Sequence, residues 1–324
     1  MGTLLGIGAG AGFVSALLFA VLTTGNPIAF ALYFVAPLPV LLAALGWNHR
    51  AGLIAALSGA AMVGLAFGLA PGLLYLVSIA APAWLFAYLL LLARSDGATE
   101  EWYPLGRLLL WIVGVSAGLT LLGALMISTD YDGLVAGFAE RVVPLIERMN
   151  PNAFEGLAAD DRTATVTDLA RLLAAVALPI STALSVGSSI ALLWLAARIV
   201  RASGRLPRPW PAIARTEIPR IGLALLGVGI VGGLVLSGFA GLFARSVAAA
   251  ALMAYCLQGL AVVHVLTTGV AGRGGILSAV YITFFILPGW PVLLYALAGV
   301  ADSLFGMRAR KLAGSTPSPP TPTI

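Results

Sequence analysis

Long stretches without any charged residue constrain the fold of this chain more than any other feature of its sequence. A helix that crosses the hydrocarbon core of a bilayer needs about 20 consecutive apolar residues. Seven stretches free of Asp, Glu, Lys and Arg reach that length: residues 1–49, 51–93, 108–129, 172–197, 221–244, 246–272 and 274–301. The chain is therefore expected to be all-α and to form a polytopic transmembrane helix bundle.

Composition supports the same fold class and excludes an ordinary soluble domain. The chain is 60% hydrophobic and only 10% charged, whereas soluble domains carry about 25% charged residues. So few charged side chains cannot cover the surface of a water-soluble protein of this length. The lipid bilayer is therefore the expected partner of the outer helix surfaces.

The lengths of the uncharged stretches predict the number of spans. The first two hold two helices each, with turns at Gly25-Asn26-Pro27 and Pro71-Gly72, and form a four-helix block over residues 1–93. The next four predict one helix each. In the last stretch, Pro288-Gly289-Trp290-Pro291 interrupts the helix and predicts either one kinked span or a hairpin of two short helices. The sequence thus predicts about nine spans, eight of them uninterrupted.

The distribution of basic residues predicts the orientation of the chain in the membrane. Cytoplasmic loops collect Lys and Arg, and residues 198–220 contain six arginines but only one acidic residue, Glu217. We expect this basic loop to be cytoplasmic and the acidic loop 130–168 to be external. The N-terminus is then cytoplasmic, and the basic residues of 308–311 favour a cytoplasmic C-terminus. A multi-pass protein of a bacterial plasma (inner) membrane is the expected result.

The sequence predicts one transmembrane domain, residues 1–311, followed by a disordered tail, 312–324, that is rich in Pro, Ser and Thr. Within the external loop, apolar residues recur at helical spacing and predict an amphipathic helix. These residues are Leu134, Phe138, Val142, Leu145 and Met149. Such a helix lies either on the outer membrane surface or over the end of the helix bundle.

Small residues on the first helix predict a close contact between helices. Helices in lipid associate through small side chains that let their backbones approach. Gly8, Gly12 and Ala16 form one such row, and Gly2, Gly6 and Gly10 form another on a neighbouring face. Two interpretations stay open for the first row, namely packing within this chain and docking on a partner membrane subunit.

Polar side chains inside the predicted spans are the candidate ligand-binding residues, because a polar group in lipid is costly and often functional. Tyr255 and Gln258 can share one face of a helix, and His264 lies nearer its cytoplasmic end. An interhelical hydrogen bond is the alternative role for His264. No Asp or Glu lies in the middle of a predicted span, which disfavours transport driven by an acidic proton relay.

Several function classes lack the residues that they need. The sequence has no phosphate-binding glycine loop, no HExxH pair and no GxSxG motif. Its two histidines and its one cysteine, Cys256, predict neither a metal site nor a disulfide. The basic residues follow membrane topology, so nucleic acid is not an expected partner. We therefore expect no enzyme, no cofactor and no bound metal.

Two segments resemble the uncharacterised YybS-like family of bacterial membrane proteins. They are Leu257 to His264, sequence LQGLAVVH, and the C-terminal pattern Gly299-Val300-Ala301-Asp302 with Phe305 and Arg308. That family is distantly similar to the substrate-binding S components of energy-coupling-factor transporters, whose first helix docks on a membrane coupling subunit. The resemblance implies that Gly8, Gly12 and Ala16 form the docking row. The chain departs from S components in size, because they have about six spans.

The leading functional hypothesis is a membrane-embedded solute-binding or transport subunit that has no ATPase of its own. Its partner is then a membrane coupling subunit or a second copy of the chain. The alternative is a structural or assembly partner of another membrane protein, without a solute. A third alternative is a membrane enzyme that acts on lipid-linked substrates through Asp160, Asp161 and Arg162 of the external loop.

Overall fold

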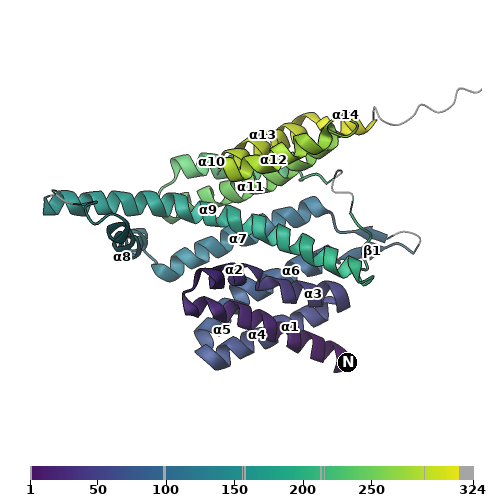
Figure 1. The fold of residues 1–324 in the computed structure, drawn as a ribbon, viewed down its shortest axis with the longest axis horizontal. Coiled ribbons are helices and arrows are strands. Elements are labelled where there is room, and N and C mark those ends of the chain that lie inside the picture. The colour runs from purple at the N-terminus through teal and green to yellow at the C-terminus, as the bar shows by residue number, and fades with distance from the viewer. Residues whose placement is uncertain are drawn as a thin grey trace, which may run out of the picture. The chain divides into compact units, whose positions relative to one another are not determined.

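The computed structural model describes residues 2–97, 100–154, 156, 158–211, 214, 216–287 and 289–313. The chain divides into two compact units, which are Met1–Val115 with Val186–Ala212, and Ser116–Ser185 with Ile213–Ile324. Helices make up nearly all of the described structure (Figure 1), and its two strands form one short antiparallel hairpin. The predicted all-α class and polytopic helix bundle are confirmed.

The first unit begins with helices that are long and apolar enough to form four membrane spans, Gly2–Thr24, Ile28–Trp47, His49–Phe67 and Leu69–Leu90. Their elements are α1 (Gly2–Ala20), η1 (Val21–Thr24), α2 (Pro27–Val35), α3 (Pro37–Trp47), α4 (His49–Phe67), α5 (Leu69–Tyr75), η2 (Leu76–Ala80) and α6 (Ala81–Leu90). A hairpin of β1 (Ala93–Ser95) and β2 (Glu100–Trp102) follows.

Asparagine and glycine residues set the ends of these helices. The side-chain oxygen of Asn26 accepts a hydrogen bond from the backbone N–H of Ile28 at 2.9 Å, which caps α2. Asn48 caps α4 in the same way by accepting from the N–H of Arg50 at 3.1 Å. Gly68 has a φ of 102°, a conformation that favours glycine, and separates α4 from α5.

A buried polar chain links three segments of the first unit. The hydroxyl of Ser15 on α1 donates to the carbonyl O of Ala36, between α2 and α3, at 2.6 Å. The hydroxyl of Tyr75 at the end of α5 donates to the Ser15 oxygen at 2.7 Å. Ser15 and Tyr75 are both fully buried. Because each hydroxyl has a partner, these polar groups can lie inside an otherwise apolar bundle.

Two long helices, α7 (Leu105–Ile127) and α9 (Ala159–Ala202), contain the boundaries between the two units. The helix predicted in the acidic loop is α8 (Tyr131–Met149), which is capped by the Asp130 carboxylate accepting from the N–H of Gly133 at 3.1 Å. Its residue Leu134 packs in a fully buried cluster with Ala124 and Leu242. Within the second unit, protein therefore covers the first part of the apolar face of α8, with Leu134 and Phe138, whereas Leu145 and Met149 near its end are exposed.

The rest of the second unit consists of α10 (Ile221–Val235), α11 (Gly238–Leu266), α12 (Arg273–Ile286), α13 (Trp290–Phe305) and α14 (Met307–Ala313). Helix α11 packs closely against both α10 and α13, and α12 contacts α13 (Figure 1). The predicted break in 274–301 is confirmed, because α12 and α13 are separate helices. Pro288 and the tail residues 314–324 lie outside the described residues.

The number of spans differs from the predicted nine. Seven described helices are long and apolar enough to cross a membrane, or eight if the bent pair of α13 and α14 counts as one span. The predicted spans 221–244 and 246–272 were bounded at Arg245, but Arg245 lies inside α11 and the chain breaks before Gly238. Helix α10 has only 15 residues, or about 22 Å of length, against a hydrocarbon core of about 30 Å.

Arg245 lies inside a helix with one end of its guanidinium paired locally, while its Nε is buried without a partner among the described residues. The guanidinium Nη1 donates to the carbonyl O of Gly233 on α10 at 3.0 Å. Gly233 has no side chain, so the aliphatic part of Arg245 can pack directly on the α10 backbone. A charged residue that reaches a backbone acceptor does not have to mark the end of a span.

Candidate functional site: a buried polar cluster on α11, α13 and α14

Two glycines bring the backbones of α11 and α13 into contact. A side chain on Gly259 of α11 would overlap the carbonyl O of Tyr295, and one on Gly299 of α13 would overlap the carbonyl O of Tyr255. Only glycine fits at either position without a shift of the backbone. This contact holds Gln258, the residue just before Gly259 on α11, against α13.

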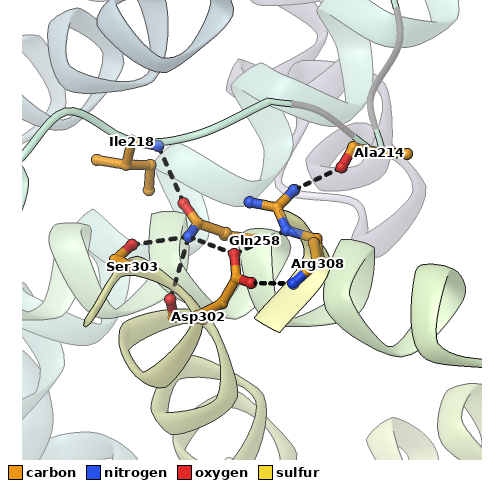
Figure 2. Close-up of polar contacts among 7 residues, drawn as sticks. Ala214, Ile218, Gln258, Asp302, Ser303 and Arg308 are labelled. Carbon is orange, nitrogen blue, oxygen red and sulfur yellow. Dashed lines mark hydrogen bonds and ion pairs between the residues drawn. The ribbon is translucent and has the colours of Figure 1, made fainter. Parts of the chain in front are cut away.

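Gln258 connects three parts of the second unit and is only 4% exposed. Its side-chain oxygen accepts a hydrogen bond from the backbone N–H of Ile218 at 3.0 Å. Its side-chain nitrogen donates to Ser303 Oγ at 2.8 Å and to the carbonyl O of Gly299 at 3.1 Å, with Asp302 Oδ2 at 3.4 Å (Figure 2). The amide therefore joins α11, α13 and the segment before α10.

Asp302 and Arg308 form an ion pair next to this amide. Arg308 Nε donates to Asp302 Oδ2 at 2.7 Å, and the backbone N–H of Arg308 donates to Asp302 Oδ1 at 2.9 Å. Both side chains are only 2% exposed. Gly306, with a φ of 62°, ends α13 between them and lets the chain turn back so that one carboxylate binds two groups of Arg308.

The guanidinium of Arg308 is the most unusual group of the cluster. Its Nη1 donates to the carbonyl O of Ala214 at 3.0 Å. Its Nη2 is buried and has no hydrogen-bond partner among the described residues, and in Figure 2 no dashed line reaches it. A buried charged donor without an acceptor costs free energy. Arg308 Nη2 can therefore donate a hydrogen bond to one further acceptor oxygen.

The family to which the chain belongs follows from a comparison of its sequence with family models. The model described as predicted membrane protein (DUF2232) matches residues 13–303. The chain belongs to the DUF2232 family of predicted membrane proteins. The match includes Gln258, Asp302 and Ser303 and ends before Arg308. Neither a curated protein nor a solved structure matches this DUF2232 protein.

Two of the three candidate ligand-binding residues lie together in the structure of this DUF2232 protein. Tyr255 is 1% exposed and lies one turn before Gln258 on α11, where its backbone meets Gly299. His264 lies elsewhere, because its Nε2 shares a hydrogen bond of 2.8 Å with the hydroxyl of Tyr281 on α12. His264 therefore makes the interhelical hydrogen bond named as its alternative role, and a ligand role for all three residues stays a prediction.

A sequence pattern points to the acidic and basic members of the cluster but not to their pairing. Asp302 and Arg308 both belong to the pattern that carried the family resemblance, yet Arg308 was interpreted as a charge of the cytoplasmic tail. The structure buries it, while Arg310 on the same helix is exposed. No sequence pattern points to Ser303, because a single serine near the end of an apolar helix is common.

The row of small residues on α1 is occupied by a helix of the same chain. Gly8 faces Ile54 and Ala51, Gly12 faces Ala55 and Ser58 of α4, and Ala16 is 6% exposed. This arrangement favours packing within the chain over docking on a partner through these three residues. Among the described residues, no group of His, Cys, Asp and Glu could hold a metal ion.

Proposed function

We propose that this DUF2232 protein is a solute-binding or transport subunit of a bacterial inner membrane that has no ATPase and no catalytic activity of its own. The single observation that carries the proposal is Arg308 Nη2, a buried cationic donor without an acceptor among the described residues. Buried charge in a membrane protein often marks a ligand pathway. The expected solute is amphipathic, with an apolar body and an oxyanion or carbonyl oxygen.

The neighbours of Arg308 support this proposal, because they fix the guanidinium in place. Arg308 Nε donates to the Asp302 carboxylate, and Arg308 Nη1 donates to the carbonyl O of Ala214. The remaining edge of the planar guanidinium is therefore preorganised to donate in one direction, which lowers the entropic cost of binding. Gln258 holds Ser303 and the backbone of α13 beside it.

The resemblance to S components of energy-coupling-factor transporters supports a subunit that depends on a partner for energy. This part of the proposal rests on the sequence patterns at 257–264 and 299–308 and on the absence of a nucleotide-binding motif. On this proposal the N-terminus and the C-terminus are both cytoplasmic, since the basic loop 198–220 is cytoplasmic.

Native mass spectrometry of the full chain, purified in mild detergent, tests the proposed solute site. The wild type should carry a small-molecule adduct that the Arg308→Lys variant has lost. Lysine keeps the charge beside Asp302 but has no planar guanidinium with a second terminal nitrogen. The matched control is Arg310→Lys, because Arg310 lies on the same helix and is exposed.

The adduct should survive in the Arg310→Lys protein, and its mass identifies the solute. A wild-type protein without any small-molecule adduct contradicts the proposal. So does an adduct that is retained equally by both lysine variants. The elution volume in size-exclusion chromatography and the melting temperature show that the variants remain folded.

A structural or assembly role is the second candidate, and one observation favours it. The other row of small residues on α1 is open, because none of the described residues comes within 4 Å of a side chain placed on Gly6 or Gly10. An open glycine row in lipid is a docking face for another helix. Gly10→Leu should then remove a co-purifying membrane protein without changing the adduct at Arg308.

A further inference from the structure

The first unit contains a cavity that the proposed solute site does not use. Its volume is about 350 Å³, and Trp47, Asn48, His49, Leu91, Arg205 and Pro207 are among the residues that line it. The cavity lies where α3 ends, α4 begins and the chain continues after α9. Its volume falls in the range of about 300–1,000 Å³ that is usual for small-molecule sites.

Arg205 gives this cavity its positive charge. The guanidinium lies over the ring of Trp47, with its carbon 4.5 Å from the ring centroid, in a cation–π contact that fixes its position. Among the described residues, no carboxylate forms an ion pair with Arg205 and no acidic residue lines the cavity. Arg205 is exposed, so its guanidinium can meet an anion from the surroundings of the protein.

The neighbouring arginines have other partners, which sets Arg205 apart from a general basic surface. Arg208 Nη1 donates to the carbonyl O of Leu90 at 2.9 Å, where α6 ends, and burial lowers the pKa of Arg208 from its ordinary value. Arg201 lies over the ring of Trp210 at 4.9 Å. Neither Arg201 nor Arg208 is among the residues that line the cavity.

The N-terminus of α4 also favours an anion in this cavity. Helix α4 has 19 residues, and its N-terminus, with Asn48 and His49, lines the cavity. The N-terminus of a helix carries a partial positive charge of about half an elementary charge. Both the positive end of α4 and the guanidinium of Arg205 would therefore attract an anion in the cavity.

Tryptophan and tyrosine side chains surround the cavity. Trp84 Nε1 donates to the carbonyl O of His49 at 3.1 Å, and the Tyr88 ring meets the His49 ring edge to face, with centroids 5.3 Å apart. Trp47 is 40% exposed. Tryptophan and tyrosine gather at membrane interfaces, and Trp47 ends α3, so we expect this cavity to lie near the lipid headgroups.

We propose that this cavity binds a phosphate-bearing anion through Arg205 and the N-terminus of α4. The phosphate belongs either to the headgroup of an anionic phospholipid or to a small water-soluble phosphate compound. Arginine suits this ligand because its planar guanidinium can form two parallel hydrogen bonds with phosphate oxygens. The site is independent of Arg308 and of the solute proposed there.

Titration calorimetry on the delipidated full chain in neutral detergent tests the site. The probes are dihexanoyl phosphatidylglycerol, dihexanoylglycerol, which has the same acyl chains without phosphate, and inorganic phosphate. The test variant is Arg205→Gln. The matched control, Arg201→Gln, removes the same charge four residues earlier, in the last turn of α9, from a residue that does not line the cavity.

Phosphatidylglycerol should bind the wild type and the Arg201→Gln protein, and Arg205→Gln should weaken this binding by about tenfold or more. Loss of inorganic phosphate binding in Arg205→Gln alone, with no phospholipid effect, supports the water-soluble source. Equal weakening in both variants, equal binding of dihexanoylglycerol, or no binding of any probe overturns the proposal. Unchanged melting temperatures show that both variants fold.

Discussion

The buried ion pair between Asp302 and Arg308 makes the sharpest prediction about stability. Asp302→Asn keeps the shape of the side chain and an oxygen for the backbone N–H of Arg308, but it removes the charge that faces the guanidinium. Arg308 is 2% exposed, so water cannot replace the lost partner. Breaking one side of a buried pair costs about 3–5 kcal/mol, and we expect a loss of this size.

A second ion pair with the same N···O distance is an internal control. Arg162 Nη2 lies 2.7 Å from Glu147 Oε1, the same distance as the buried pair, but these side chains are 52% and 40% exposed. Exposed pairs contribute about 0–1 kcal/mol, because water screens the charges. Glu147→Gln should therefore cost under about 1 kcal/mol.

The double variant separates the ion pair from its surroundings. Arg308→Gln alone leaves the Asp302 carboxylate buried without its cation and should cost as much as Asp302→Asn. When both changes are combined, no uncompensated charge remains, so the loss should be well below the sum of the two single losses.

Unfolding in mixed micelles with increasing dodecyl sulfate, followed by tryptophan fluorescence, measures these free energies. The reasoning is refuted if Asp302→Asn costs no more than Glu147→Gln. It is also refuted if the losses of the two single variants simply add.

Three further predictions concern packing within each unit. Gly259→Ala should sharply reduce the yield of monodisperse protein in size-exclusion chromatography, since the new methyl group would overlap the Tyr295 carbonyl, whereas Gly227→Ala, in open space, should be neutral or slightly stabilising. Gly12→Leu should lower the melting temperature because it separates α1 from α4, while Gly10→Leu should not, and equal effects would contradict the assigned faces. Tyr75→Phe removes the donor to Ser15 and should cost about 1 kcal/mol of unfolding free energy in the micelle assay, and no loss would contradict the buried link.

The sequence predicts the helices well where lipid decides the structure. Uncharged stretches must become helices in a bilayer, because no other element satisfies its own backbone there. The break after α12 was also predictable, since proline removes a backbone donor. Arg245 misled the prediction, because the sequence cannot show that its guanidinium reaches the carbonyl O of Gly233. The end of α10 was therefore placed too late.

The polar cluster was only partly predictable, because its members are far apart in the sequence. Gln258 stands out as a polar residue in an apolar helix, so it was found from the sequence alone. Its hydrogen-bond partners are far away along the chain on both sides. Gly299 lies 41 residues after Gln258, and Ile218 lies 40 residues before it. Arg308 looks like any other basic residue after the last span. Only the αL turn at Gly306 reveals that it folds back onto Asp302.

The most direct test of the proposed solute site is to determine which atoms surround Arg308 Nη2 when the protein is in a lipid nanodisc. A cryo-electron microscopy map of the wild-type chain, purified without removal of bound small molecules, would show it. We predict density for a non-protein molecule with an oxygen about 3 Å from Arg308 Nη2. A map in which Nη2 is paired with a protein oxygen, or in which no molecule lies beside it, contradicts the proposed function.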